Sequence, residues 1–168
     1  MKKSMFILYL VSAIFYYLLI KEIINTLNVF YEPAFIVLMI LYLIFGYALY
    51  VDNKKWQFVT YLLGLSTLLF YRKSAHGFNF DFYMTEWIKF LFKNKIITIN
   101  IIGNILLFIP LGLYLKNIIY GVSVITILEL LQVLFKRGLF DIVDIFLNTI
   151  GILIGVVIVW MIKIKKTI

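Results

Sequence analysis

The sequence contains no cysteine and only one histidine, His76. Without cysteine the chain can form no disulfide, thiol nucleophile or zinc–thiolate site, and a single histidine argues against multi-histidine metal sites. Acidic residues are also scarce, because eight Asp and Glu stand against 16 Lys and Arg, which gives a net charge of +8. Most of these cations lie at the ends of apolar segments. Their placement indicates anchoring at a membrane surface and not nucleic-acid binding.

Apolar residues are abundant: they make up 64% of the sequence, and the mean hydropathy is +1.05. Soluble domains are about half apolar, so this composition predicts an integral membrane protein. A bilayer core of about 30 Å requires about 20 helical residues. We therefore predict an all-α, polytopic bundle of about six membrane-spanning helices in a single domain that covers residues 1–168. The predicted spans are 5–20, 33–51, 56–70, 96–115, 118–135 and 139–162.

The third predicted span is short, so a bundle of five spans is the alternative. The first span is expected to remain uncleaved, because no small-residue cleavage site precedes Lys21. With six spans and a cytoplasmic N-terminus, the cations divide equally between the two sides of the membrane. Those inside lie in short loops and tails, where the positive-inside rule is most reliable. We therefore predict that both termini are cytoplasmic.

The connection at residues 71–95 is the longest in the chain. It carries charged and apolar residues at helical spacing, namely Glu86, Lys89 and Lys93 on one side and Trp87, Phe90 and Leu91 on the other. This pattern predicts an amphipathic helix that lies in the headgroup region of the membrane. An N-terminal extension of the next span is the alternative.

The last three predicted spans carry polar side chains, which are costly inside a bilayer and are therefore functional candidates. These residues are Asn100, Asn104, Glu129, Gln132, Asp141, Asp144 and Asn148, and Arg137 joins them from the turn between the fifth and sixth spans. Within each span the polar residues recur at helical spacing, so each set shares one helical face. Counting about 1.5 Å per residue from the span ends places all three sets near the same membrane face. We predict that they converge in one pocket there, at the extracytoplasmic face.

Two of these charged residues suggest particular chemistry. The Arg137 guanidinium, in a Lys136-Arg137-Gly138 turn, can pair with an aspartate or receive a phosphate or carboxylate with two parallel hydrogen bonds. Glu129 is an acid within reach of the hydrocarbon, which favours a functional role. A buried ion pair with one of the neighbouring cations is the alternative for Glu129.

Other residues of the region have simpler explanations. Asparagines commonly hydrogen-bond between packed membrane helices. Asp141 and Asp144 could be a solvated helix start that the helix dipole favours. Gly151 and Gly155 form a G-x-x-x-G pattern, which is typical of close helix packing. Pro110 predicts a kink or a helix break.

At these residues the chain resembles the VanZ-like family of bacterial membrane proteins, which is named for a glycopeptide-resistance accessory. The resemblance is carried by about the last 70 residues, with its motifs at about 96–162, and leaves the first two spans outside. The matching residues are Asn100, Gly103-Asn104, Leu107 to Gly112, Glu129, Gln132, Arg137, Phe140-Asp141-Ile142, Asp144, Leu147-Asn148-Thr149, Gly151 and Gly155. A looser similarity lies at Asn79-Phe80-Asp81-Phe82, but the proline expected there is missing, so no role is assigned to that segment.

The resemblance implies a multi-pass protein of the bacterial cytoplasmic membrane, whose named relative is associated with reduced susceptibility to teicoplanin-type lipoglycopeptides. Our leading hypothesis is a site that recognises an amphiphile, such as a lipid-linked wall precursor, a polyprenyl phosphate or the lipoglycopeptide itself. The alternatives are an intramembrane enzyme that acts on a lipid head group, and a proton-coupled transporter. Whether the chain is an enzyme is left open. No cofactor is expected, although a divalent cation at the carboxylates is possible.

Overall fold

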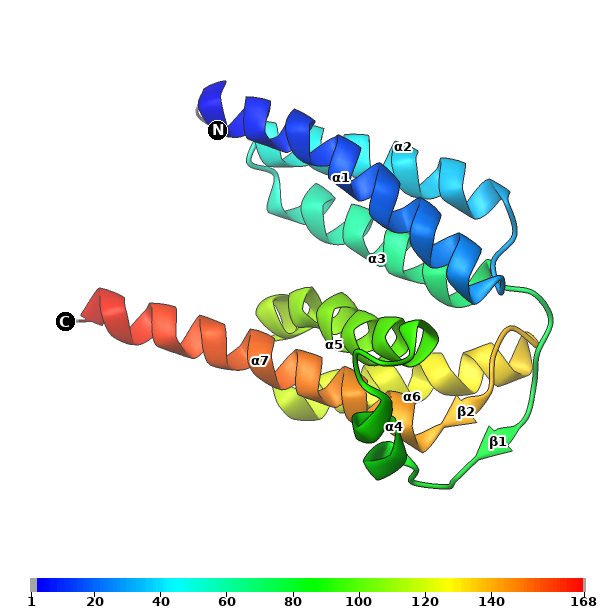
Figure 1. Cartoon of the computed structure of the whole chain (residues 1–168). Coiled ribbons are helices and arrows are strands. Elements are labelled where there is room, and N and C mark those ends of the chain that lie inside the picture. The colour runs from blue at the N-terminus through cyan, green and yellow to red at the C-terminus, as the bar shows by residue number, and fades with distance from the viewer. Residues whose placement is uncertain (1–2, 168) are drawn as a thin grey trace. The chain divides into compact units, whose positions relative to one another are not determined.

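The computed structural model of the protein describes residues 3–167 (Figure 1). Lys2, one of the cations used to predict the orientation, lies outside the described residues. The described chain contains seven helices and two strands of two residues each, which confirms the predicted all-α membrane bundle. It divides into two compact units, residues 1–73 and 74–168. The arrangement of the whole chain as one domain stays a prediction.

The first unit contains α1 (Lys3–Leu27), α2 (Pro33–Tyr50) and α3 (Lys54–Phe70). Proline occupies the first turn of α2, where its missing N–H costs no hydrogen bond. The turn into α3 is closed by Asn53, whose side-chain oxygen accepts a hydrogen bond of 3.1 Å from the Trp56 N–H. α1 and α2 are held together by aromatic stacking of Tyr42 against Tyr9 and Tyr16.

The second unit contains the strands β1 (Phe78–Asn79) and β2 (Phe140–Asp141), and the helices α4 (Met84–Phe90), α5 (Lys95–Leu115), α6 (Ile118–Leu134) and α7 (Ile142–Thr167). α5 and α6 each begin at an asparagine whose side-chain oxygen accepts backbone N–H hydrogen bonds, as N-terminal caps do. β1 and β2 pair in parallel, with Phe78 opposite Phe140 and Asn79 opposite Asp141.

α5 and α7 run in the same direction and their backbones approach very closely. A Cβ atom added to Gly151 would lie 2.2 Å from the Ile105 carbonyl oxygen, and one added to Gly155 would lie 2.3 Å from the Ile109 carbonyl oxygen. The predicted packing role of the G-x-x-x-G pattern is therefore confirmed. α5 continues through Pro110 to its end, so this proline is not a helix break.

Four helices of the described chain are long and apolar enough to cross a membrane, by length and composition. They comprise residues 9–27, 33–50, 95–115 and 142–164. α6 is apolar but shorter, at 17 residues. The exact number of spans, six or five, stays a prediction.

The structure differs from the predicted elements in the first unit, where α1 continues to Leu27 and does not end at residue 20, and at two places in the second unit. α7 begins at Ile142 and not at residue 139, because Phe140 and Asp141 pair with β1 instead of continuing a helix. The helix in the long connection is present but has only seven residues. Trp87, and Leu91 directly after the helix, pack against the core of the unit, whereas Phe90 is exposed; the location of the helix in the headgroup region stays a prediction.

The glycine contacts generate a stability prediction. Gly151→Ala should lower the free energy of unfolding by about 1 to 3 kcal/mol, because the new methyl group forces α5 and α7 apart. Gly103→Ala is the matched control on α5, since a Cβ atom at that glycine meets nothing within 4 Å and alanine favours the helix. Thermal unfolding in detergent micelles, followed by circular dichroism, measures both. Equal stability of the two variants would contradict the close contact.

Candidate functional site

The site is built around Asp141, which lies at the junction of β2 and α7. Its side-chain Oδ1 accepts a hydrogen bond of 2.8 Å from the Val143 N–H, so it caps the first turn of α7. Its Oδ2 accepts a hydrogen bond of 3.0 Å from Asn79 Nδ2 and a second one from the Tyr83 hydroxyl. The residue is only 7% exposed. Asp141 is therefore a buried carboxyl group with three donors and not a solvated helix start.

The strand pair explains how Asn79 reaches this carboxyl group. Parallel pairing places Asn79 directly opposite Asp141. The pairing is extended by hydrogen bonds from the Phe140 N–H to the Gly77 carbonyl, 2.9 Å, and from the Ala75 N–H to the Lys136 carbonyl, 3.0 Å. The Asn79 side-chain oxygen accepts from the backbone N–H two residues later, at 3.1 Å. This bond fixes the amide so that its nitrogen points toward Asp141.

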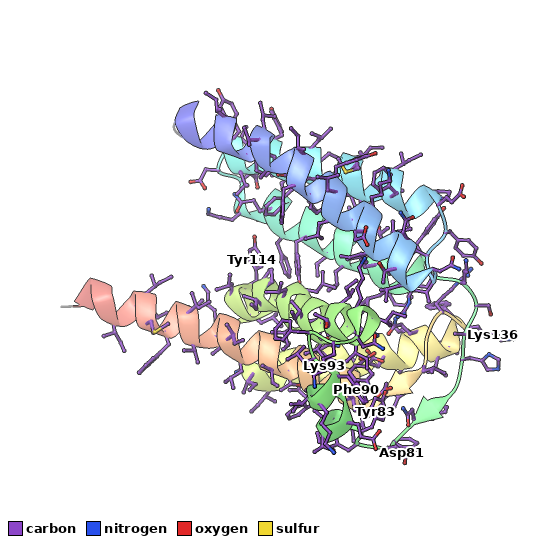
Figure 2. The ribbon with its side chains drawn as sticks, in the orientation of Figure 1. Asp81, Tyr83, Phe90, Lys93, Tyr114 and Lys136 are labelled. Carbon is purple, nitrogen blue, oxygen red and sulfur yellow. The ribbon has the colours of Figure 1, made fainter. Side chains whose placement is uncertain are left out.

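Tyr83, labelled in Figure 2, stands immediately before α4 and completes the set of donors. The pKa of its hydroxyl is raised well above the usual range. Burial is the main cause, followed by the hydrogen bond to Asp141 and the negative charges of Asp141 and Asp144. Each of these effects favours the neutral phenol. Tyr83 therefore remains a hydrogen-bond donor throughout the physiological pH range.

Asn104 and Asp144 link α5 to α7. The Asn104 Nδ2 donates a hydrogen bond of 2.7 Å to Asp144 Oδ1, and both residues are half-buried. These two predicted site residues are therefore in direct contact. They lie on the same side of the helix pair as the glycine contacts, because Gly151 is two turns beyond Asp144 on α7.

α6 contributes Glu129 and Gln132, which are both buried. The backbone carbonyl of Gln132 accepts a hydrogen bond of 2.7 Å from the Arg137 N–H. The Gln132 side chain lies against Gly138, in the turn that leads to Asp141. Because α6 runs antiparallel to α7, Glu129 is level with the first turns of α7.

Asn148, Asn100 and Arg137 complete the set of predicted site residues. Asn148 is only 2% exposed, and its Oδ1 has no hydrogen-bond partner among the described residues. Asn100 is half-buried, and within the described part of the chain its side chain makes no hydrogen bond to the other site residues. Arg137 is held through its backbone, which bridges to Ala75 beside the strand pair. Asn104 and Asp144 are in direct contact, and the convergence of the whole set in one pocket stays a prediction.

Sequence reasoning missed Asn79 and Tyr83. Both come from the long connection, where a looser similarity was noted at residues 79–82 but no role was assigned. A second signal is present in the sequence: polar or phenolic residues at 79, 81 and 83 alternate with phenylalanines at 78, 80 and 82. Alternation with a period of two is typical of extended chain with two different faces.

The site is rich in hydrogen-bond acceptors on carboxyl and amide groups. Such groups bind amines and hydroxyls. Within residues 3–167, no three His, Cys, Asp or Glu side chains gather closely enough to hold a metal ion. The divalent cation at the carboxylates stays a prediction.

The bond from Tyr83 to Asp141 can be tested by Tyr83→Phe. Loss of a donor to a buried carboxyl group should lower the free energy of unfolding by about 1 to 3 kcal/mol. Tyr120→Phe, at an exposed position on α6, is the control and should be neutral. Thermal unfolding of both variants provides the comparison, and hydrogen exchange in residues 75–83 should increase only in Tyr83→Phe.

The effect of Tyr83→Phe on the free energy of unfolding should depend on pH. The folded-state pKa of Tyr83 lies above its usual value of 10.0, so its contribution to stability is complete below that pH and is lost as the pH rises through the folded-state pKa. The cost of Tyr83→Phe should therefore be the same at neutral and at mildly alkaline pH. A cost that stays constant as the pH rises well above 10.0 would show that Tyr83 ionises at the same pH in the folded and the unfolded protein.

With this geometry established, comparison with known proteins identifies the family. The family model described as VanZ/LLP1 matches residues 34–163. No curated protein and no solved structure matches the chain. The match begins in α2, so the expectation that the first two spans lie outside the resemblance is wrong for the second. Because the match covers more than half of the chain, from α2 to α7, this protein belongs to the VanZ/LLP1 family of membrane proteins.

Proposed function

We propose that this protein is a multi-pass protein of the bacterial cytoplasmic membrane that binds the polar head of an amphiphile near the extracytoplasmic face. The ligand class comprises lipid-linked wall precursors, polyprenyl phosphates and lipoglycopeptides. Through such binding the protein would alter susceptibility to teicoplanin-type antibiotics. The apolar surfaces of the helices would hold the lipid tail, and the polar residues of α5, α6 and α7 would hold the head.

The observation that carries this proposal is the hydrogen bond of 2.7 Å between Asn104 and Asp144. Both side chains belong to helices long and apolar enough to cross a membrane. Polar side chains inside such helices are costly and are usually retained for function. The bond lies next to the hydrogen-bonded Asp141, so that polar groups gather at one end of an otherwise apolar unit.

The chemistry of the region suits a head that carries both polar donors and an anionic group. The carboxyl groups of Glu129 and Asp144 suit amino or hydroxyl groups. The turn between α6 and β2 supplies Lys136 and Arg137, and guanidinium groups recognise phosphates and carboxylates with paired hydrogen bonds. Lipid-linked wall precursors and lipoglycopeptides carry groups of these kinds on long apolar tails.

A binding measurement with the intact chain in lipid nanodiscs tests the proposal. Polyprenyl phosphate and a lipid-linked wall precursor serve as probes. Asp144→Asn keeps the size of the side chain but removes its charge, and should weaken binding by about tenfold, equivalent to about 1.4 kcal/mol. Asp52→Asn is the matched control, because Asp52 is an exposed carboxylate of the first unit, 2.8 Å from Lys54. Unchanged affinity after Glu129→Gln combined with Arg137→Ala would refute the site.

A second experiment tests the effect on antibiotics. The protein is expressed in a susceptible Gram-positive host, and the inhibitory concentration of a teicoplanin-type lipoglycopeptide is measured. We expect a shift relative to the empty host that is lost in single variants at Glu129, Arg137 and Asp144 but kept in Asp52→Asn. Immunoblots of membrane fractions control for expression. Mass spectrometry of envelope lipids from the same cells would reveal turnover, which would support the enzyme alternative instead.

A further inference from the structure

The segment before α4 has two different faces. Asn79 and Tyr83 turn toward Asp141, whereas the phenylalanines between them are exposed, with Phe80 at 66%. The backbone is extended at Phe78–Asn79, which pair with β2, and the polar and aromatic side chains alternate along the sequence from 78 to 83. One stretch of chain therefore presents polar groups to the site and phenyl rings to the surroundings.

Five phenylalanines of this region, which we call the aromatic face, lie close together: Phe78, Phe80, Phe82 and Phe146, which are exposed, and Phe140, which is half-buried. The rings of Phe78 and Phe80 are stacked, with centroids 6.1 Å apart, and Phe140 lies 5.8 Å from each. Phe82 meets Phe146 edge to face at 5.3 Å. The contacts form two groups, one across β1 and β2 and the other between Phe82 and the start of α7. The aromatic face is thus an ordered surface and not a set of scattered side chains.

α4 adds apolar and cationic groups beyond the aromatic face. Its inner side, which includes Trp87, packs against the core formed by α5 and α7. Ile88, Phe90 and Phe92 are exposed, with Phe92 at 79%, and Lys89 and Lys93 are exposed as well. Figure 2 labels Phe90 and Lys93 at the end of this helix. Exposed rings alternate with ammonium groups along the outer side.

The position of these groups in the fold indicates what covers them. α5 begins at Lys95 and α7 at Ile142, so both of these apolar helices begin beside the aromatic face and α4. A bilayer that contains α5 and α7 therefore has its headgroup region at this end of the unit. Aromatic rings favour that region, and lysines near it are attracted to anionic lipid. In water, by contrast, such an apolar surface would favour aggregation.

We propose that the aromatic face and the outer side of α4 bind the headgroup region of a leaflet that contains anionic lipid. The surface in contact with the leaflet thus includes the segment around β1 as well as α4. Its binding to lipid does not depend on the identity of any ligand of the site. It has a consequence for the site: the leaflet holds the outer face of the segment whose inner face places Asn79 and Tyr83 on Asp141. The membrane surface then helps to hold Asn79 and Tyr83 against Asp141.

The absence of cysteine makes the test direct, because any introduced cysteine can be labelled alone. Phe80→Cys and Phe92→Cys report on the proposed lipid-facing surface, and Asp81→Cys is the control at an exposed polar neighbour. Each variant carries a nitroxide label in the intact chain, in nanodiscs with anionic lipid and without added ligand. Electron paramagnetic resonance compares accessibility to oxygen, which concentrates in lipid, with accessibility to a water-soluble nickel chelate.

We expect the ratio of oxygen to nickel accessibility to be severalfold higher at positions 80 and 92 than at position 81. Labels that are equally accessible to nickel at all three positions would overturn the proposal, because the surface would lie in water. Labels at 80 and 92 protected from both reagents would also overturn it, because protein would then cover the surface. The two lipid-facing variants keep the test valid if one of them fails to fold.

The cations give an independent comparison. Replacing Lys89 and Lys93 with glutamine should reduce the depth of the label at position 92 in anionic nanodiscs and leave it unchanged in neutral ones. Lys54→Gln with Lys55→Gln is the matched control in the first unit. An equal effect in both lipid compositions would contradict attraction by anionic head groups. Since no wall precursor, polyprenyl phosphate or lipoglycopeptide is added, failure here can be distinguished from failure of the proposed function.

Discussion

The second unit is organised by the need to satisfy a buried carboxyl group at the start of an apolar helix. A carboxyl group removed from water without hydrogen-bond donors is strongly destabilising. Asp141 meets this requirement with the Val143 N–H, the Asn79 amide and the Tyr83 hydroxyl. Two of the three donors come from a distant segment. This one carboxyl group holds together the strand pair, the connection before α4 and the first turn of α7.

Close approach of α5 and α7 is the second condition for the site. Asparagine and aspartate have short side chains, so Asn104 and Asp144 can bond only if their helices lie close together. The glycines of α7 allow this, since the backbone carbonyls of α5 occupy the space that a larger side chain would need. Packing residues two turns away from the polar contact therefore determine its geometry. The small residues and the polar residues of this region are parts of one arrangement.

Sequence patterns predicted the helices well because long apolar segments and their polar ends are local signals. The positions of Asn104 and Asp144 on facing helices followed from helical periodicity and alternating span direction. The start of α7 did not, because Leu139 and Phe140 are apolar residues that fit a helix equally well. Only the pairing of β2 with β1 removes Phe140 from the helix.

Asn79 and Tyr83 could not be assigned by the same reasoning. Their partner is far away in the sequence, and no periodicity connects an irregular segment to a distant helix start. Asn100 shows that helical periodicity can also select a residue that does not bond to the rest of the site. It shares a helical face with Asn104, yet makes no side-chain hydrogen bond to the other site residues in the described chain. A shared face places a residue on the right side of a helix but does not give it a partner.

The distance along the chain between Asn79 and Asp141 has a consequence for how the protein is made. The two residues are 62 positions apart, and α4, α5 and α6 are synthesised between them. Residues 75–83 therefore leave the ribosome long before their partner exists, and their polar groups must remain hydrated until then. The aromatic side chains of the same segment can meet the lipid surface during this interval. Docking onto Asp141 is consequently a late step of biogenesis, completed after α5 and α6 have inserted.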